Sequence, residues 1–398
     1  MTTTINNIPQ GYKATVLGII PQEWEVKRLG EICTYFKSGE GITSKDISEN
    51  GQYPVYGGNG LRGYTDKKYT HDGAYILIGR QGALCGNINY VTGKCYISEH
   101  AIAVQTKGDL SWLRYKLDFW NLNRYSESSA QPGLSVEKLV RYKLTVPPLA
   151  EQRKIAEVLG VWDEAIEKQE RLIEQLALRK RGLMQRLLSA KLRLPGFSEP
   201  WQKVKLGDIC ERVTRKNIED NQNVMTISAQ RGFVAQTDFF NKSVASETLE
   251  SYYLVFRDEF CYNKSYSNGY PMGAIKRLSE AEKAVVTSLY ICFNVKPGTD
   301  ANIDYLSYYF DNGGLNRGLT KIANEGGRAH GLLNVTPKDF FGLSFEIPSL
   351  KEQTAIAEVL TAADREIELA KEKLERLRRQ KRGLMQQLLT GKKRVHHE

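Results

Sequence analysis

The 398-residue sequence lacks the short motifs by which many enzymes are recognised. It contains no GxxxxGK[ST] phosphate loop, no HExxH zinc motif and no GxSxG nucleophile turn. A Gly-x-Gly occurs in "FKSGEGI" at Phe36, but no Asp/Asn-Pro-Pro-aromatic tetrapeptide accompanies it, as an adenine methyltransferase would require. The five histidines are dispersed and indicate no metal site. These absences favour a protein that recognises another molecule over one with chemistry of its own.

Paired cysteines and long apolar runs are missing as well. The six cysteines include no CxxC pair, so neither a zinc site nor a redox pair is indicated, and we expect mostly buried, reduced thiols. No run approaches the ~18 apolar residues of a membrane span. The start, "MTTTINNIPQGYK", lacks the charged-then-apolar pattern of a secretory signal. We therefore expect a cytoplasmic protein that does not enter a membrane.

The sequence does contain apolar residues for buried cores, at 41%, and a net charge of +10. Lys and Arg placed near phosphates release counterions, so a basic protein is a plausible partner for a polyanion such as nucleic acid. A basic protein without such a partner is the alternative, and charge alone does not separate the two.

A long internal repeat divides the chain into two halves. The stretch "EQRKIAEVLGVWDEAIEK" from Glu151 returns as "EQTAIAEVLTAADREIEL" from Glu352, and "KRGLMQRLL" from Lys180 returns as "KRGLMQQLL" from Lys381, both at an offset of 201 residues. Upstream, "PQEWEVKRLGEIC" and "EPWQKVKLGDIC" match with an offset of 177. Each half therefore has a tryptophan-led strand, a variable body and a nearly identical helix. Two copies of this size indicate a duplicated domain, because solenoid repeats are only ~20 to 50 residues long.

Apolar residues in the repeated helices follow alternating steps of 4 and 3. A 3.5-residue repeat sustained over more than four heptads predicts a coiled-coil seam, with the other copy as the obvious partner. Lys180 and Lys381 interrupt the two stripes, which suggests a place where the helices separate. The predicted seam comprises Ile155, Leu159, Trp162, Ile166, Ile173 and Leu176 in the first helix, and Ile356, Leu360, Ala363, Ile367, Leu374 and Leu377 in the second.

The geometry of one chain constrains this coil. About 38 residues make a rod of roughly 57 Å, so the first helix carries the chain away from body one and the second returns it. We expect an α/β (α+β) protein in which two globular domains are separated by an intramolecular antiparallel coiled coil, with pseudo-twofold symmetry. The expected divisions are residues 1–150 for the first globular domain, 151–192 for the first helix, 193–350 for the second globular domain, and 351–398 for the second helix and tail.

The variable bodies are rich in strands and glycine-containing loops. Body one has "YPVYGGNGLRGYTD" and "GAYILIGRQGALCGNINY", and body two has "CYNKSYSNGYPMGAIKRL". Glycine lets backbone approach phosphates, while amide and guanidinium side chains read base edges. Tight hairpins are the structural alternative for each loop.

These motifs in this order resemble the specificity subunit of type I restriction-modification enzymes. The resemblance rests on "IPQEWEVKRLGEIC" and "LPGFSEPWQKVKLGDIC", which are similar to the openings of that family's two target-recognition domains, and on "VPPLAEQRKIAEVL" and "IPSLKEQTAIAEVL", which are similar to the starts of its two conserved helices. It covers nearly the whole chain. The single departure is "PSL" at Pro348, where the first copy has a doubled proline.

The resemblance implies a function and a set of partners. Each globular domain would read one half of a bipartite double-stranded DNA site, and the coil would hold the readers apart and dock two modification subunits. Those methyltransferase subunits would bind S-adenosylmethionine and methylate adenine, a restriction or translocase subunit could join them, and this chain would be non-catalytic. A coiled-coil scaffold whose domains bind protein, and a self-sufficient DNA enzyme, are the alternatives.

Candidate DNA-binding residues follow from the loop chemistry. Arginine can bond guanine bidentately and glutamine can bond adenine. The candidates in body one are Asn59, Arg62, Arg80, Gln81, Ser129 and Gln131, and those in body two are Lys264, Tyr266, Asn268, Arg328 and His330. Each could serve a structural role instead, and Arg80 could pair with an acid. The basic helix ends, including Arg179 and Arg378, could touch spacer phosphates or an acidic partner face, or could simply be solvated.

Overall fold

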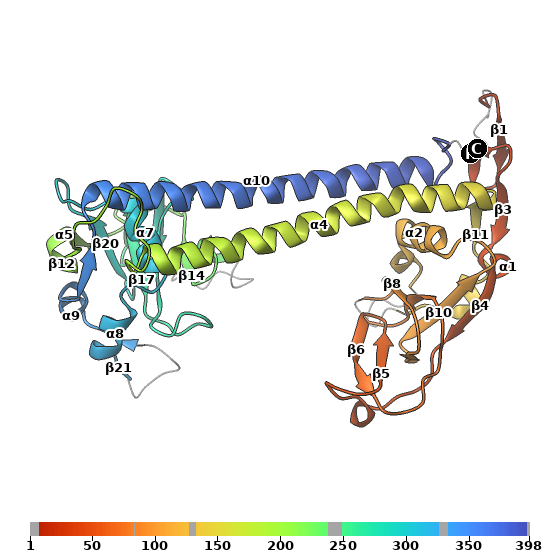
Figure 1. The fold of residues 1–398 in the computed structure, drawn as a ribbon, viewed down its shortest axis with the longest axis horizontal. Helices are drawn as coiled ribbons and strands as arrows, with labels where there is room; N and C mark the ends of the chain where they lie inside the picture. The colour runs from red at the N-terminus through yellow and green to blue at the C-terminus, as the bar shows by residue number, and fades with distance from the viewer. Residues whose placement is uncertain (1–7, 83, 127–132, 238–248, 326–332, 396–398) are drawn as a thin grey trace. The chain divides into compact units, whose positions relative to one another are not determined.

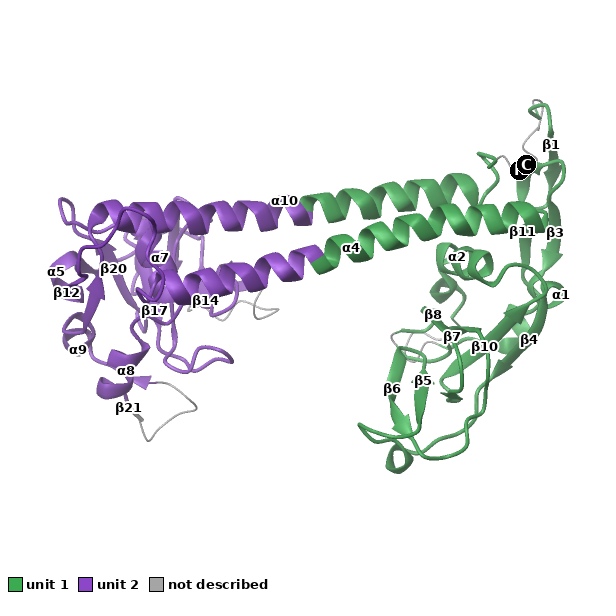
Figure 2. Cartoon of the chain, viewed as in Figure 1, with its two compact units in different colours: residues 1–171, 372–398 green, residues 172–371 purple. Residues whose placement is uncertain are grey.

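A computed structural model describes residues 8–82, 84–126, 133–237, 249–325 and 333–395, and the chain divides into two compact units (Figure 2). Unit 1 comprises residues 1–171 and 372–398, and unit 2 comprises residues 172–371. The division falls inside both long helices, whereas the sequence analysis predicted domain boundaries at the ends of the helices. Each unit therefore consists of one globular domain and one half of each long helix.

The two long helices are α4 (Leu149–Leu187) and α10 (Leu350–Leu388), and they begin and end at equivalent positions of the repeat. Both start within two residues of the predicted positions, α4 directly after Pro148 and α10 two residues after Pro348. All twelve predicted seam side chains are buried or half-buried. The helices are continuous through the boundary between the units, since each has 39 helical residues.

Ion pairs show the direction in which the helices run beside each other within each unit. In unit 1, Arg378 lies 2.6 Å from Glu170 and Lys381 lies 2.5 Å from Asp163. From the first pair to the second, the residue number rises in α10 and falls in α4, so the helix halves are antiparallel in this unit. Arg179 with Glu366, and Lys180 with Asp364, give the same order in unit 2.

The globular domain of unit 1 contains a four-stranded antiparallel sheet in the order β4-β10-β7-β8. The strands of unit 1 are β1 (Tyr12–Thr15), β2 (Gly18–Pro21), β3 (Glu25–Arg28), β4 (Cys33–Ser38), β5 (Tyr53–Gly57), β6 (Gly60–Thr65), β7 (Tyr75–Gly79), β8 (Ile88–Val91), β9 (Tyr96–Ile97), β10 (Ala101–Thr106) and β11 (Lys143–Val146). Its shorter helices are α1 (Leu29–Ile32), α2 (Leu110–Trp120) and α3 (Val136–Leu139), with 3-10 turns η1 (Ser44–Asp46) and η2 (Leu122–Tyr125). A further sheet, β6-β5-β9, carries the first glycine-rich loop (Figure 1).

Unit 2 has the equivalent four-stranded antiparallel sheet in the order β13-β20-β17-β18. Its strands are β12 (Gln202–Lys205), β13 (Cys210–Val213), β14 (Met225–Ser228), β15 (Gly232–Ala235), β16 (Tyr253–Phe256), β17 (Phe260–Asn263), β18 (Ala274–Arg277), β19 (Lys283–Val286), β20 (Ile291–Val295), β21 (Asn324–Glu325), β22 (Leu333–Asn334) and β23 (Ser344–Ile347). Its shorter helices are α5 (Leu206–Ile209), α7 (Ile303–Asp311), α8 (Asn316–Ile322) and α9 (Pro337–Phe341).

The two domains share a framework and differ in what is inserted into it. The tryptophan-led strands β3 and β12 pair with β11 and β23, the strands that lead into the long helices. One helix then crosses the sheet, α2 in unit 1 and α7 in unit 2, each with a side chain capping its first turn: Asp109 accepts from the Trp112 N–H, and Asn302 accepts from the Tyr305 N–H. The strands β5, β6 and β9 of unit 1 and β14, β15, β16 and β19 of unit 2 belong to the variable bodies.

Each domain core is completed by both long helices. The unit 1 core joins Ile155 and Leu159 near the start of α4 to Leu388 at the end of α10. The unit 2 core joins Ile356 and Leu360 near the start of α10 to residues at the end of α4, among them Leu187. Burial of this apolar surface is the main force that holds the helices on the domains.

The glutamate of each repeated Glu-Gln motif is buried at the start of a long helix. Glu151 is fully buried, accepts the indole N–H of Trp24 at 2.9 Å and pairs with Arg394 at 2.7 Å. Glu352 pairs bidentately with Arg193, at 2.6 and 2.7 Å. Each buried carboxylate thus meets an arginine that follows the end of the other long helix.

Removing one of these arginines should weaken one unit only. Arg193→Met would leave the buried Glu352 carboxylate unpaired, which costs about 3 kcal/mol in the free energy of unfolding. Hydrogen-deuterium exchange should then accelerate around β12 and the start of α10 in unit 2, while unit 1 keeps its protection. Arg394→Met should produce the reverse pattern. As a control, Lys168→Met removes only an exposed pair with Glu164 and should change neither unit. Equal loosening of both units by either arginine variant would contradict this assignment.

Candidate nucleic-acid interface

The first candidate loop of unit 1 leaves the sheet at the end of β7. This strand is fully buried, and Arg80 and Gln81 are the first residues after it. The Arg80 N–H donates to the His100 carbonyl at 2.9 Å, and the Arg80 carbonyl accepts the Leu134 N–H at 2.9 Å. Both backbone groups are therefore held, and the half-buried side chain extends from a fixed point. Among the described residues no carboxylate pairs with Arg80, so the alternative of an acidic partner gains no support there.

The β5-β6 turn lies against this loop. A Cβ at Gly58 would come within 2.9 Å of the His100 carbonyl and 3.1 Å of the Gly79 Cα, so only glycine allows this approach. Asn59 is exposed in the turn and Arg62 is exposed on β6. The structure thus brings Asn59 and Arg62 to the same edge of the domain as Arg80 and Gln81.

His100 is a member of this cluster that the sequence interpretation missed. It lies directly before β10, and its Nδ1 is 3.3 Å from the Gln81 Oε1, while its Nε2 is 3.4 Å from Glu99. In the sequence it is one of five dispersed histidines. Only the pairing of β10 with β7 brings it beside Gln81, and that pairing cannot be read from local sequence. With Gln81 it adds a second side chain that can donate to or accept from a base edge.

The equivalent loop of unit 2 joins β17 to β18. Lys264 is the first residue after β17, Tyr266 is 64% exposed, and Asn268 is exposed near a turn closed by hydrogen bonds between Ser267 and Tyr270. The Asn268 carbonyl accepts from the Gln230 side chain at 3.0 Å. An exposed tyrosine beside a lysine offers a ring face and a cation to one ligand, a combination that suits nucleic acid.

Arg80 and Lys264 occupy the same place in the two domains. Each follows the strand that lies between the same neighbours in its sheet, β10 and β8 in unit 1, β20 and β18 in unit 2. The Lys264 carbonyl accepts the Leu333 N–H at 3.1 Å, just as the Arg80 carbonyl accepts the Leu134 N–H. Two loops with unrelated sequences therefore share one backbone anchor, at the carbonyl of their first residue, and each begins with a cation.

Four other candidates lie outside the described residues: Ser129, Gln131, Arg328 and His330. Their assignment remains a prediction. The chain after these segments returns to the two loops, because the N–H groups of Leu134 and Leu333 donate to the carbonyls of Arg80 and Lys264.

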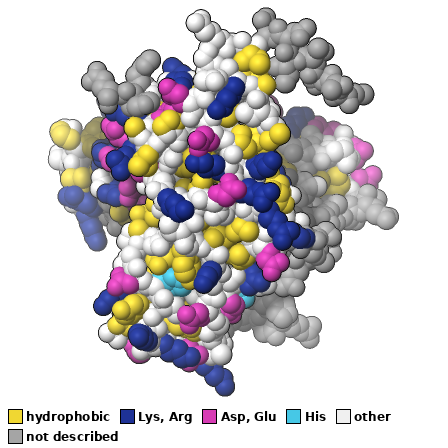
Figure 3. All heavy atoms as spheres, turned by 90° about the vertical axis from the view of Figure 1, so that its right-hand side faces the viewer, with side chains coloured by type: hydrophobic (Ala, Val, Ile, Leu, Met, Phe, Trp, Pro, Cys, Tyr) yellow, Lys and Arg dark blue, Asp and Glu magenta, His cyan; other side chains and the backbone are white. Residues whose placement is uncertain are grey.

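Charge is not concentrated in one patch on the face of unit 1 shown in Figure 3, where Lys and Arg side chains are spread with Asp and Glu between them. The two helix arginines of interest are partly engaged: Arg179 pairs with Glu366, and Arg378 pairs with Glu170 and Glu375. These pairs give both arginines a role in the contact between the helices.

The seam lysines each bond to an aspartate of the other long helix, and the separation of the helices at these positions stays a prediction. In unit 1, Asp163 accepts the Tyr115 hydroxyl and the Lys381 ammonium, both at 2.5 Å, and Lys381 lies 5.0 Å from the centre of the Tyr115 ring. Burial, and then the bond to Asp163, raise the pKa of Tyr115, which keeps its hydroxyl protonated as a donor. Burial raises the pKa of Asp163, but the bonds from Lys381 and Tyr115 outweigh it and lower that pKa overall.

Unit 2 repeats this arrangement with the helices exchanged. Asp364 accepts the Tyr308 hydroxyl at 2.7 Å and the Lys180 ammonium at 2.5 Å, and Lys180 lies 5.1 Å from the centre of the Tyr308 ring. We call the sets Tyr115-Asp163-Lys381 and Tyr308-Asp364-Lys180 the two clasps. Each joins the crossing helix of a domain to both long helices.

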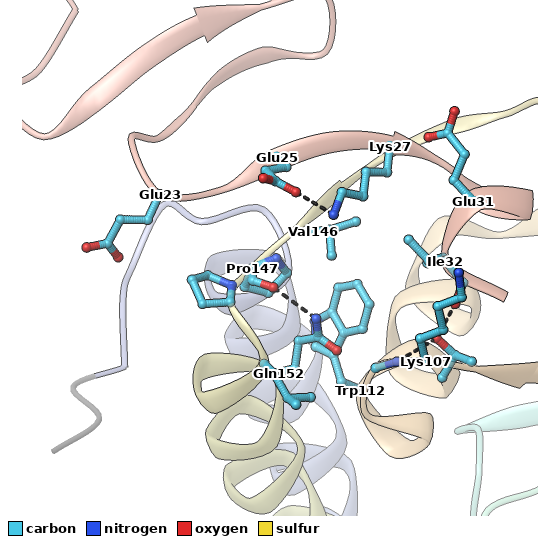
Figure 4. A pocket seen from close by; sticks show the side chains of 14 residues that line it. Glu23, Glu25, Lys27, Glu31, Ile32, Lys107, Trp112, Val146, Pro147 and Gln152 are labelled. Atoms are coloured by element: carbon cyan, nitrogen blue, oxygen red, sulfur yellow. Dashed lines mark hydrogen bonds and ion pairs between the residues drawn. The ribbon is translucent and has the colours of Figure 1, made fainter. Parts of the chain in front are cut away.

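A cavity of about 390 Å³ lies beside the start of α4 in unit 1 (Figure 4). Gln152 on its wall donates to the Pro147 carbonyl and accepts the Asp109 N–H, both at 2.9 Å. Lys27 pairs with Glu25 at the rim, and a hydrogen bond from Lys27 lowers the pKa of that glutamate. The cavity therefore belongs to the junction between domain and helix, apart from the candidate base-reading loops.

The described ranges contain no group of three or more His, Cys, Asp or Glu side chains that could hold a metal ion. In the same part of the chain, no helix has the length and apolar content needed to cross a membrane.

Comparison with known proteins agrees with this two-domain framework. Residues 21–177 and 198–379 match the family model described as the type I restriction modification DNA specificity domain. The chain is 42% identical over 160 residues to the type I restriction enzyme EcoprrI specificity subunit of Escherichia coli, a match that spans 38% of this chain and only 39% of that relative. It is 24% identical over 413 residues to the MjaVIII specificity subunit of Methanocaldococcus jannaschii, covering 94% of each.

Solved structures show the same fold. The crystal structure of the type I restriction-modification S subunit from M. genitalium matches with a TM-score of 0.55 at 16% identity, covering 92% of this chain and 96% of that one. A structure described as showing complex assembly and conformational transition of the type I R-M system matches with the same score and identity, over 94% of this chain.

Proposed function

Because the chain belongs to the type I restriction modification DNA specificity family, we propose that each globular domain reads one half of a bipartite DNA site. The observation that carries the proposal is the equivalence of Arg80 and Lys264. Each begins a loop at the equivalent point of its own domain's sheet, and the loop sequences differ, as two readers of different half-sites require. Backbone anchoring limits the entropy lost when such a loop binds.

The long helices have the second role in this proposal. They form an intramolecular antiparallel coiled coil that relates the two halves by a pseudo-twofold and sets the distance between the half-sites. Because their sequences and their clasps are repeated, they present two near-equivalent faces, which suits the docking of two copies of one partner. The partners are two methyltransferase subunits that bind S-adenosylmethionine and methylate adenine in DNA. A restriction or translocase subunit joins the same complex.

This chain supplies recognition and the partners supply the chemistry. Arg80, Gln81, Lys264 and the other candidates hold and orient the DNA, and no step of methyl transfer is assigned to them. The site of action is the cytoplasm, where the DNA and the partner subunits are found. A scaffold that binds only protein is the second candidate, and the cavity beside Gln152 is the feature that would favour it.

A gel-shift experiment separates the alternatives. The chain co-expressed with its methyltransferase subunits should bind duplex DNA, and its affinity should fall steeply with salt because Lys and Arg displace counterions. Mapping methylated adenines should give a site split into two halves. Assembly with partners but without duplex binding would favour the scaffold. Methylation or cleavage by the isolated chain would favour an enzyme.

A further inference from the structure

The two clasps lie at the same sequence spacing from the start of their helices, and apolar packing alone does not require this agreement. Asp163 is eleven positions after Gln152 on α4, and Asp364 is eleven positions after Gln353 on α10. On the crossing helices, each clasp tyrosine is six positions after the N-cap, Tyr115 after Asp109 and Tyr308 after Asn302. The same two contact points therefore exist in both units.

The first contact point ties the start of the crossing helix to the start of the long helix. Gln152 accepts the Asp109 N–H at 2.9 Å, and Gln353 accepts the Asn302 N–H at 2.8 Å. The clasp is the second point, about 16 Å farther along the long helix at ~1.5 Å per residue. Two separated attachments fix the angle between two helices. In unit 1 the Arg114 guanidinium of α2 also donates to Asp163, at 3.1 Å, so it acts at the same point as the Tyr115 hydroxyl.

Hydrogen bonds are suited to fixing that angle because they are directional, while the apolar core is not. Trp112, Leu113 and Leu117 of α2 are buried against the same core as Ile155 and Leu159 of α4, and this packing keeps the domain attached. The clasp adds a bond with a defined direction. Its carboxylate also holds the lysine of the second long helix, so both long helices are aligned with the domain at once.

We propose that Tyr115 and Tyr308 are positioning residues that fix the angle of each recognition domain on the long helices and thereby restrict the complex to one spacer length between the half-sites. The inference rests on the proposed function. Neighbouring spacer lengths differ by one base pair, which turns a half-site by roughly 34° and moves it by about 3.4 Å. A domain held at one angle cannot follow that rotation, and a domain that pivots can.

The variants Tyr115→Phe and Tyr308→Phe remove the hydroxyl and keep the ring. A hydrogen bond to a charged acceptor is worth roughly a ten- to hundredfold change in an equilibrium constant. In the assembled complex with its methyltransferase subunits, initial methylation rates are measured on DNA with unchanged half-sites and with the wild-type spacer, one base pair fewer and one more. Each variant should reduce the preference for the wild-type spacer by about tenfold or more, and should keep the half-site sequences.

Matched controls lose a tyrosine hydroxyl inside each domain. Tyr96 donates to the Gly41 carbonyl and Tyr262 donates to the Met272 carbonyl, each at 2.9 Å. Tyr96→Phe and Tyr262→Phe should leave the spacer preference intact. The inference is overturned if the clasp variants keep the full preference, if all three rates fall by one factor, or if the controls relax the spacer equally. A wild-type complex that methylates no split site would overturn the proposed function itself, and the inference with it.

Discussion

Lengthening both long helices by one heptad, after Leu176 and after Leu377, should widen the unread spacer by about three base pairs and leave both half-sites unchanged. Seven residues are two turns of a supercoiled helix, so every seam residue stays in register. The added length is roughly 10 Å at ~1.5 Å per residue, which corresponds to about three base pairs at ~3.4 Å each. Because the domains also turn about the DNA, the change should match three to within about one base pair.

The contacts observed in each unit make these insertion points suitable. Leu176 lies between Asp163 and Lys180 on α4, and Leu377 lies between Asp364 and Lys381 on α10. Both clasps and both domain cores therefore remain outside the lengthened region. Methylated sites of the lengthened protein would be mapped in the assembled complex.

Two further insertions serve as controls. Two residues in place of seven would turn the seam by about 200°, at roughly 100° per residue, away from its partner, and should abolish assembly or activity. A heptad in α4 alone would leave the helices unequal and should do the same. An active protein with two heptads that keeps the original spacer, or reads altered half-sites, would show that the coil does not set the spacing.

The long helices could be predicted from sequence because the spacing of their apolar residues is a local pattern and occurs in both halves of the chain. Steps of 4 and 3 fix which side chains share a stripe, and the prolines before Leu149 and Leu350 fix where each helix begins. The same pattern did not show what surrounds Lys180 and Lys381. A lysine in an apolar stripe indicates an interruption, and nothing in the period shows that an aspartate on the other helix and a tyrosine ring lie beside it.

The clasp tyrosines were missed because their signal is faint. Residues 112–118, "WLRYKLD", and 305–311, "YLSYYFD", share a Leu, a Tyr and an Asp at the same positions. That similarity lies inside bodies that otherwise differ, and its offset of 193 residues matches neither of the longer repeats. Its meaning depends on contacts with Asp163 and Asp364, which are about fifty residues away in each case.

The sheets could not be predicted from sequence for a related reason. In unit 1, β10 lies between β4 and β7, so the sheet order differs from the chain order. The turn at Gly58 meets Gly79 only because these strands pair as they do. Sequence chemistry selected Asn59, Arg62, Arg80 and Gln81 one loop at a time, and the fold supplies their shared edge. Their contacts with bases remain a prediction.

Replacing Arg80 and Gln81 together by alanine should relax recognition of one half-site and leave the other unchanged. A good bidentate contact discriminates by ~1 to 3 kcal/mol, so losing both side chains should reduce discrimination at their base pairs by roughly a hundredfold or more. The fold should survive, because Arg80 is held through backbone groups that alanine also has. Lys264→Ala with Asn268→Ala should affect only the other half-site, since those residues lie in the equivalent loop of unit 2.

Methylation of a library with every single-base variant of both half-sites would measure the effect. Arg141→Ala removes one exposed cation from unit 1 outside both loops and controls for the change in net charge. A uniform loss of affinity across all sites, with a smaller dependence on salt, would assign Arg80 to a phosphate and not to a base. Unchanged binding and methylation at every half-site variant would remove both residues from the interface. If each pair of substitutions changes only its own half-site, the two equivalent loops act as independent readers.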